Sequence, residues 1–180
     1  MRNARSTWLV VSPSIAIAAI FASTVHAKVI SVSANGFEVR EQLNVELSAD
    51  KVYEAILSPA LWWSSEHTYS GSAGNMTLDP HAGGCWCEKL EKGGSVQHLQ
   101  VVYVSPGHAL RLRGALGPLQ GMAVDGAMTW TLKDTPKGTD ITLTYAVGGY
   151  SKGGFAALSA AVDQVLADQV ARLRNSLQAP

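Results

Sequence analysis

Two cysteines separated by one tryptophan stand in the segment GGCWCEKL, residues 83–90, and they are the only cysteines of the 180-residue chain. In an extended strand, Cys85 and Cys87 point to the same face with their Cα atoms about 6.6 Å apart. That separation is at the upper edge of disulfide geometry, so the spacing favours two free thiols. An oxidising compartment would favour a disulfide, which remains the alternative. Lys89 shares their face, which indicates the wetter side, and we expect both cysteines to be dispensable for folding.

The same segment also raises the question of a metal site. A C-x-C pair on one strand can chelate soft metals, but structural zinc sites usually draw four ligands from C-x-x-C or H-x-x-x-H spacings, and no second close pair accompanies Cys85 and Cys87. His81 is the other weak candidate ligand. It flanks Pro80 together with Asp79, a pattern typical of an exposed turn. We therefore expect no metal and no cofactor.

Glu88 and His98 are the residues best suited to acid–base chemistry. The residues EKGGS between them predict a hairpin that places the two side chains opposite or diagonal to one another. On the inner face of a sheet they would form a carboxylate–imidazole pair, able to orient a polar ligand or to act as general acid and base, with Glu41 or Gln100 as a further participant. A polar pair that only sets strand register is the alternative. A slip of one residue would separate the two side chains altogether.

Other chemistries lack support in the sequence. No G-x-S-x-G nucleophile motif occurs, and the glycines of GGYSKGG, residues 148–154, do not match a phosphate-binding spacing. The chain has 14 basic and 14 acidic residues. This balance argues against nucleic-acid binding, which needs a basic face.

The N-terminal segment predicts export. Arg2 and Arg5 precede an apolar run that ends before Val25-His26-Ala27, which is the layout of a cleavable signal peptide. We expect residues 1–27 to be removed and the mature chain to comprise residues 28–180. The protein would then be periplasmic or secreted, with no stable membrane anchor after cleavage.

The elements that must position these residues follow from hydrophobic periodicity. Asn35-Gly36 predicts a hairpin between two strands, short helical segments follow at 49–58 and after Pro59, and six alternating strands occupy residues 76–147. Residues 155–178 have an apolar helical stripe that Gln169 interrupts. The expected fold is α+β: a curved antiparallel sheet wrapped around a long C-terminal helix, with two short helices after the first long strand. A ligand cavity is expected between sheet and helix.

Several segments resemble one superfamily. VYEAILSPALWW, GGCWCE, VVYVSPGHALRLRGALGPLQG, GAMTWTLKDTPKGTDITLTYAVGGY and the final helix resemble the START-like, or helix-grip (SRPBCC), proteins, which include polyketide cyclases. The resemblance covers residues 37–178 and is closest to the bacterial branch with a domain like that of activators of the heat-shock ATPase. It implies a single helix-grip domain that binds lipids, polyketides, hormones or proteins. Chaperone activators work in the cytosol, so an export signal counts against a co-chaperone role.

Three functions follow as hypotheses, led by an exported protein that binds a hydrophobic or amphipathic small molecule. A cyclase-like or hydrolase-like enzyme using Glu88 and His98 is the alternative, and a protein-binding module is the third. Trp62 and Trp63 are not both expected to point inward, so one should sit at the cavity mouth, and residues 114–121 form a candidate lid. The candidate ligand-binding residues are Trp62, Trp63, Tyr69, Trp86, Glu88, His98, Gln100, Leu112, Trp130, Tyr145, Val162 and Gln169.

Overall fold

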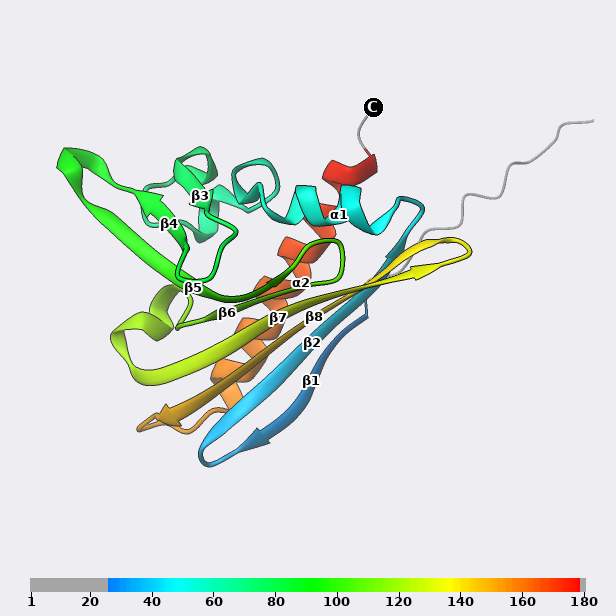
Figure 1. The fold of residues 1–180 in the computed structure, drawn as a ribbon. Coiled ribbons are helices and arrows are strands. Elements are labelled where there is room, and N and C mark those ends of the chain that lie inside the picture. The colour runs from blue at the N-terminus through cyan, green and yellow to red at the C-terminus, as the bar shows by residue number, and fades with distance from the viewer. Residues whose placement is uncertain (1–25, 179–180) are drawn as a thin grey trace, which may run out of the picture.

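The computed structural model describes residues 26–178, and nearly all of the predicted signal peptide lies outside them. Eight strands form one antiparallel sheet in the order β1-β2-β8-β7-β6-β5-β4-β3 (Figure 1). The strands are β1 (His26–Ser33), β2 (Gly36–Val45), β3 (Met76–Leu78), β4 (Cys85–Lys89), β5 (Ser95–Ser105), β6 (Ala109–Arg113), β7 (Ala123–Thr135) and β8 (Gly138–Tyr150).

A long helix lies across one face of this sheet, as Figure 1 shows. Helix α2 (Ala156–Gln178) packs on β1, β2 and the short helix α1 (Ala49–Ile56). The predicted helix-grip architecture is confirmed. The remaining helical segments are single 3₁₀ turns: η1 (Pro59–Leu61), η2 (Ser65–His67), η3 (Ala73–Asn75), η4 (Glu91–Gly93) and η5 (Gly117–Gly121).

The first hairpin is present, but its turn is displaced by one residue. Ser33 pairs with Gly36, so the two turn residues are Ala34 and Asn35, and Gly36 is the first residue of β2. A Cβ on Gly36 would lie 2.2 Å from the carbonyl oxygen of Val147. This glycine is therefore required by the close approach of β8 and not by the turn.

Three register irregularities interrupt the sheet, between β1 and β2, between β4 and β5, and between β5 and β6. An extra residue in one strand bends that strand and increases its twist. Two of the three involve β5, which lies near the edge of the sheet where the 3₁₀ turns gather.

No helix among residues 26–178 is long and apolar enough to cross a membrane.

Candidate functional site

A buried carboxylate–imidazole pair connects β4 and β5. Nε2 of His98 lies 2.9 Å from Oε2 of Glu88. The Glu88 residue is 0% exposed and the His98 residue 4%. The predicted pairing of the two side chains is confirmed, whereas its role stays a prediction.

Glu88 also accepts two backbone hydrogen bonds from the loop that follows η2. The amide of Tyr69 donates to Oε2 at 3.1 Å, and the amide of Ser70 donates to Oε1. Burial on its own raises the pKa of Glu88, but the hydrogen bonds from Ser70, Tyr69 and His98 outweigh that effect, so the pKa lies below its usual value. The carboxylate is thus ionised at neutral pH and fastens this loop to β4.

The protonation state of His98 follows from the same contacts. Burial lowers the pKa of His98 below its usual value, and the neighbouring Glu88 opposes this shift only in part. The neutral ring carries one proton, and the ionised Glu88 requires that proton on Nε2. Nδ1 then has a free lone pair and can accept a hydrogen bond or a proton.

A β-bulge places His98 on the inner face. Cys85 pairs with Gln100 and Trp86 with Leu99, but Cys87 pairs with Gln97, so His98 is the extra residue of β5. His98 and Leu99 are consequently both buried, although they are consecutive.

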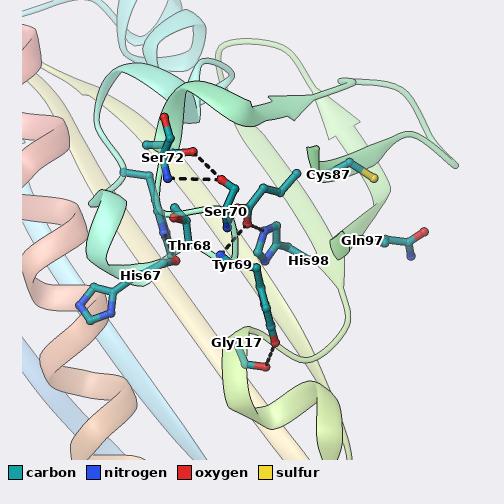
Figure 2. Close-up of polar contacts among 12 residues, drawn as sticks. His67, Thr68, Tyr69, Ser70, Ser72, Cys87, Gln97, His98 and Gly117 are labelled. Atoms are coloured by element: carbon teal, nitrogen blue, oxygen red, sulfur yellow. Dashed lines mark hydrogen bonds and ion pairs between the residues drawn. The ribbon is translucent and has the colours of Figure 1, made fainter. Parts of the chain in front are cut away.

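A cavity of about 550 Å³ lies beside His98, between α2 and two loops. Its α2 wall consists of Leu158, Ala161, Val162, Val165 and Leu166, and residues 116–119 and 66–69 form the opposite walls. Figure 2 shows the Tyr69 side chain reaching from beside His98 to Gly117, whose carbonyl oxygen accepts a hydrogen bond from the Tyr69 hydroxyl at 2.8 Å. The cavity is therefore apolar along α2 and 116–119, and polar near His98.

A second, larger depression of about 860 Å³ lies over the β7–β8 hairpin. Its lining is polar and includes Glu46, Asp134 and Lys137, and none of these three charged residues is buried. We place the candidate site in the smaller cavity, because apolar walls with few polar groups are typical of small-molecule sites.

The sequence matches one protein-family model over residues 36–178, described as polyketide cyclase / dehydrase and lipid transport. The match covers most of the chain. The protein belongs to the polyketide cyclase / dehydrase and lipid transport family.

Solved structures share the fold at low sequence identity. The Mesorhizobium loti protein MLL2253 is 17% identical, with 78% of this chain and 96% of that chain covered and a TM-score of 0.57. A Rhizobium leguminosarum protein is 14% identical, with 87% and 98% covered and a TM-score of 0.59. DynU16, from the dynemicin biosynthetic locus, is 21% identical, with 78% and 47% covered and a TM-score of 0.53. No protein with a curated description matches the chain significantly.

Within this polyketide cyclase-family fold, the cavity contains only some of the predicted ligand-binding residues. Trp63, Tyr69, His98 and Val162 line it. Trp86, Leu112 and Trp130 point to the inner side but lie in the packed core beneath it.

The prediction that Trp62 and Trp63 could not both point inward is wrong. Both rings are buried, and their centroids lie 5.6 Å apart in an edge-to-face arrangement. The ring centroid of Trp63 lies 4.9 Å from that of Trp86, and the ring centroid of Trp62 lies 6.0 Å from that of Trp130. A single 3₁₀ turn precedes the pair, so the helical spacing that would separate consecutive side chains does not apply.

Gln100 is on the outer face, contrary to the prediction. The bulge at His98 reverses the alternation of the residues that follow it up to Val101, so Leu99 and Val101 are buried and Gln100 is exposed. Its side chain donates to the carbonyl oxygen of Gly83 at 3.4 Å. Gln100 therefore cannot assist the Glu88–His98 pair.

Tyr145 and Gln169 do not line the cavity, but each forms hydrogen bonds with a backbone segment next to its walls. The Tyr145 hydroxyl donates to the carbonyl oxygen of Gly114 at 2.9 Å and accepts from the amide of Leu116 at 3.1 Å. Burial, with a smaller contribution from Asp125, raises the pKa of Tyr145 to about 12 despite the bond from Leu116. Oε1 of Gln169 accepts from the amide of Ser64 at 2.7 Å, so this glutamine joins α2 to the loop before η2.

Glu41 is buried on the inner face of β2 and does not line the cavity. Neither of its carboxyl oxygens has a hydrogen-bond partner, and Oδ1 of Asp163 on α2 is also buried without one. Burial raises the pKa of Glu41 to about 8, and the negative charge of Asp163 adds to the shift. The structure therefore does not support the proposed role of Glu41 beside Glu88 and His98.

Cys85 and Cys87 form a disulfide, so the expectation of two free thiols is wrong. Their Cα atoms lie 5.3 Å apart, closer than the roughly 6.6 Å of an extended strand, so the backbone of β4 is shortened around Trp86 and the separation falls well within the range for a disulfide. His81 pairs with Asp79 in an exposed turn. Within the described part of the chain, no group of three or more His, Cys, Asp or Glu side chains is arranged to hold a metal.

Of the α2 residues in the cavity wall, Leu158 and Ala161 are absent from the sequence-based cavity prediction. Residues 114–121 are the candidate lid, and Leu116 and Leu119 in that loop form apolar walls of the cavity. The apolar stripe of the last helix was the available signal. Periodicity alone does not distinguish a stripe that contacts the sheet from one that borders an open space.

Proposed function

We propose that this protein binds an amphipathic small molecule in the cavity between α2 and residues 116–119. The observation that carries the proposal is an apolar-walled space of about 550 Å³ with the buried, hydrogen-bonded His98 at its polar end. An apolar group gains free energy by leaving water for such walls, and a polar group needs a hydrogen-bond partner there. An open cavity at this position also supports a small-molecule ligand over a protein partner.

The polar end of the cavity, at His98, favours a ligand that carries a hydrogen-bond donor. Glu88 occupies Nε2 of His98, so the neutral ring offers Nδ1 as an acceptor. An alcohol or phenol can donate to that nitrogen. A carboxylate cannot, and it would also lie near the ionised Glu88, which disfavours it.

Filling the cavity should abolish binding without harming the fold. Ala161 lines the cavity and is exposed, whereas its exposed neighbour Ala160 does not line it. Ala161→Trp should weaken binding of the fluorescent probe N-phenyl-1-naphthylamine by more than about tenfold, a change of about 1.4 kcal/mol, because the indole occupies the probe's space. Ala160→Trp is the matched control and should bind as the wild type does. Equal binding by both variants would place the ligand elsewhere.

General-base catalysis by His98 is a second candidate function, supported by the Glu88 carboxylate on Nε2 and the free Nδ1. Such a pair can remove a proton next to a ketone, with the proton passing to Nδ1 and an enolate forming. We expect wild-type protein to accelerate exchange of the C1 protons of 2-tetralone in D₂O, and His98→Gln to lower the rate by about 100-fold.

The pH profile of this exchange provides a second check. Because the pKa of His98 lies below its usual 6.5, the rate should rise with pH through a value below 6.5 and be level at pH 7. An exchange rate equal to that of His98→Gln at every pH would contradict the enzymatic function and leave the binding function intact.

We also propose that residues 1–27 direct export and that residues 28–180 are the mature domain. The support is the basic start, the apolar run and the small residues Val25 and Ala27. Mass spectrometry of the exported protein should give an N-terminus at Lys28. A mature protein that begins at Met1 would contradict the proposal.

A further inference from the structure

The disulfide and the β-bulge lie at the same place in the sheet. Cys85 pairs with Gln100 and Cys87 with Gln97. One residue of β4, Trp86, therefore lies opposite two residues of β5, His98 and Leu99. With the disulfide formed, the Cα atoms of Cys85 and Cys87 lie 5.3 Å apart, whereas the same two residues of an extended strand would lie roughly 6.6 Å apart. The length of β4 at this point is therefore set by the bond between the two sulfur atoms.

The residues that hold the His98 ring are covalent neighbours of Cys87. Glu88 follows Cys87 and binds Nε2 of His98 at 2.9 Å. Trp86 precedes Cys87 and its ring centroid lies 6.1 Å from that of His98. A change of backbone geometry at Cys87 must therefore move both neighbours of the His98 ring.

We propose that the Cys85–Cys87 disulfide is a redox-sensitive element that positions His98 in the cavity. A dithiol reductant breaks the S–S bond, each sulfur gains one electron and one proton, and the dithiol becomes a disulfide. β4 is then free to extend between residues 85 and 87. The distance between the Cα atoms of Cys85 and Cys87 then increases, and Glu88 shifts relative to His98, the bulged residue of β5.

The position of the disulfide allows this reaction without entry into the cavity. Both cysteines are partly exposed on the outer face of the sheet. Figure 2 shows Cys87 and Gln97 pointing away from His98 and the loop of Tyr69. A reductant thus approaches from one face of the sheet and the effect appears on the other.

Removal of the disulfide should not unfold the protein. A bond that closes a loop of only three residues removes little conformational entropy from the unfolded chain, because the stabilisation by a disulfide grows with the length of the loop that it closes. Cys85→Ser/Cys87→Ser should therefore fold, and its response can be compared with that of the reduced wild type. Lys89→Ser is the control, because Lys89 is exposed on the same strand and face but outside the disulfide.

The direct test is NMR of the imidazole nitrogens in histidine-labelled protein. We expect dithiothreitol to shift the His98 signals of wild type and Lys89→Ser. The double serine variant should show the shifted signals with or without dithiothreitol. His98 signals that are identical in oxidised wild type, reduced wild type and the double variant would overturn the proposal.

A binding measurement extends the test to the ligand, and this part rests on the proposed function. Reduction should weaken binding of 1-naphthol, which can donate to Nδ1, by about 2- to 10-fold, the factor that corresponds to one hydrogen bond. Binding of 1-methylnaphthalene, which has no donor, should change less. If the oxidised protein binds neither compound, the proposed function fails, and the NMR measurement still decides the redox inference. Equal weakening of both compounds would contradict the positioning of His98.

Discussion

Glu88→Ala is expected to destabilise the protein by about 3 to 5 kcal/mol, because three hydrogen-bond donors lose the acceptor that they share and each unpaired donor costs about 1 to 3 kcal/mol. The variant leaves the amides of Tyr69 and Ser70 and the Nε2–H of His98 without the acceptor that they share in the wild type. Leaving buried donors unpaired costs far more than an average hydrogen bond contributes. Urea unfolding at pH 7 measures the loss.

The matched control is Glu91→Ala, because Glu91 is exposed in the η4 turn between the same two strands. Its unfolding free energy should stay within about 0.5 kcal/mol of the wild type. Glu88→Gln keeps one acceptor oxygen and should lie between the two. A Glu88→Ala variant as stable as Glu91→Ala would show that the carboxylate does not fasten the loop of residues 69–70.

The pH dependence of this contribution has a definite sign. The pKa of Glu88 is lower in the folded protein than its usual 4.5, so the folded state holds its proton less tightly than the unfolded chain does. The stabilisation by ionised Glu88 is therefore present above pH 4.5 and is lost as the pH falls through the folded pKa. Glu88→Ala should lack this acid-side loss.

Glu41→Gln is expected to stabilise the protein by about 2 to 3 kcal/mol at pH 7, because each unit of pKa shift corresponds to about 1.4 kcal/mol. The pKa of Glu41 is about 8 in the folded protein against a usual 4.5. Between these values the unfolded chain has lost the proton that the folded protein retains. Wild-type stability from this group is thus complete below pH 4.5 and decreases as the pH rises toward 8.

Unfolding free energies at pH 4.5, 7 and 8 test this expectation. The advantage of Glu41→Gln should be near zero at pH 4.5 and largest at pH 8. Glu46→Gln, at an exposed position just beyond the end of β2, should behave as the wild type does. A Glu41→Gln variant that is less stable than the wild type at pH 7 would show that the protonated carboxyl group has a favourable partner that the amide cannot use.

Much of the candidate site could be predicted because it depends on local pattern. The alternation of Cys85 to Lys89 placed Trp86 and Glu88 on the inner face, and the short connection to β5 brought His98 within reach of Glu88. Gln100 could not be placed in the same way. A bulge adds one residue without leaving a signal in the hydrophobic pattern, and it exchanges the faces of the residues that follow it, here Leu99 to Val101.

Hydrophobic periodicity predicts the order of strands and helices, the antiparallel sheet and the apolar stripe of α2, because it reports which residues are buried together. Three features became visible only in the folded chain: Cys85 and Cys87 are joined, Trp62 and Trp63 both lie inside, and the cavity lies along Leu158–Leu166. These features depend on the bulge between β4 and β5 and on contacts between residues far apart in the chain. Burial and pairing of that kind depend on how whole strands and helices pack together. The hydrophobic pattern within one strand or helix does not identify the element against which it packs.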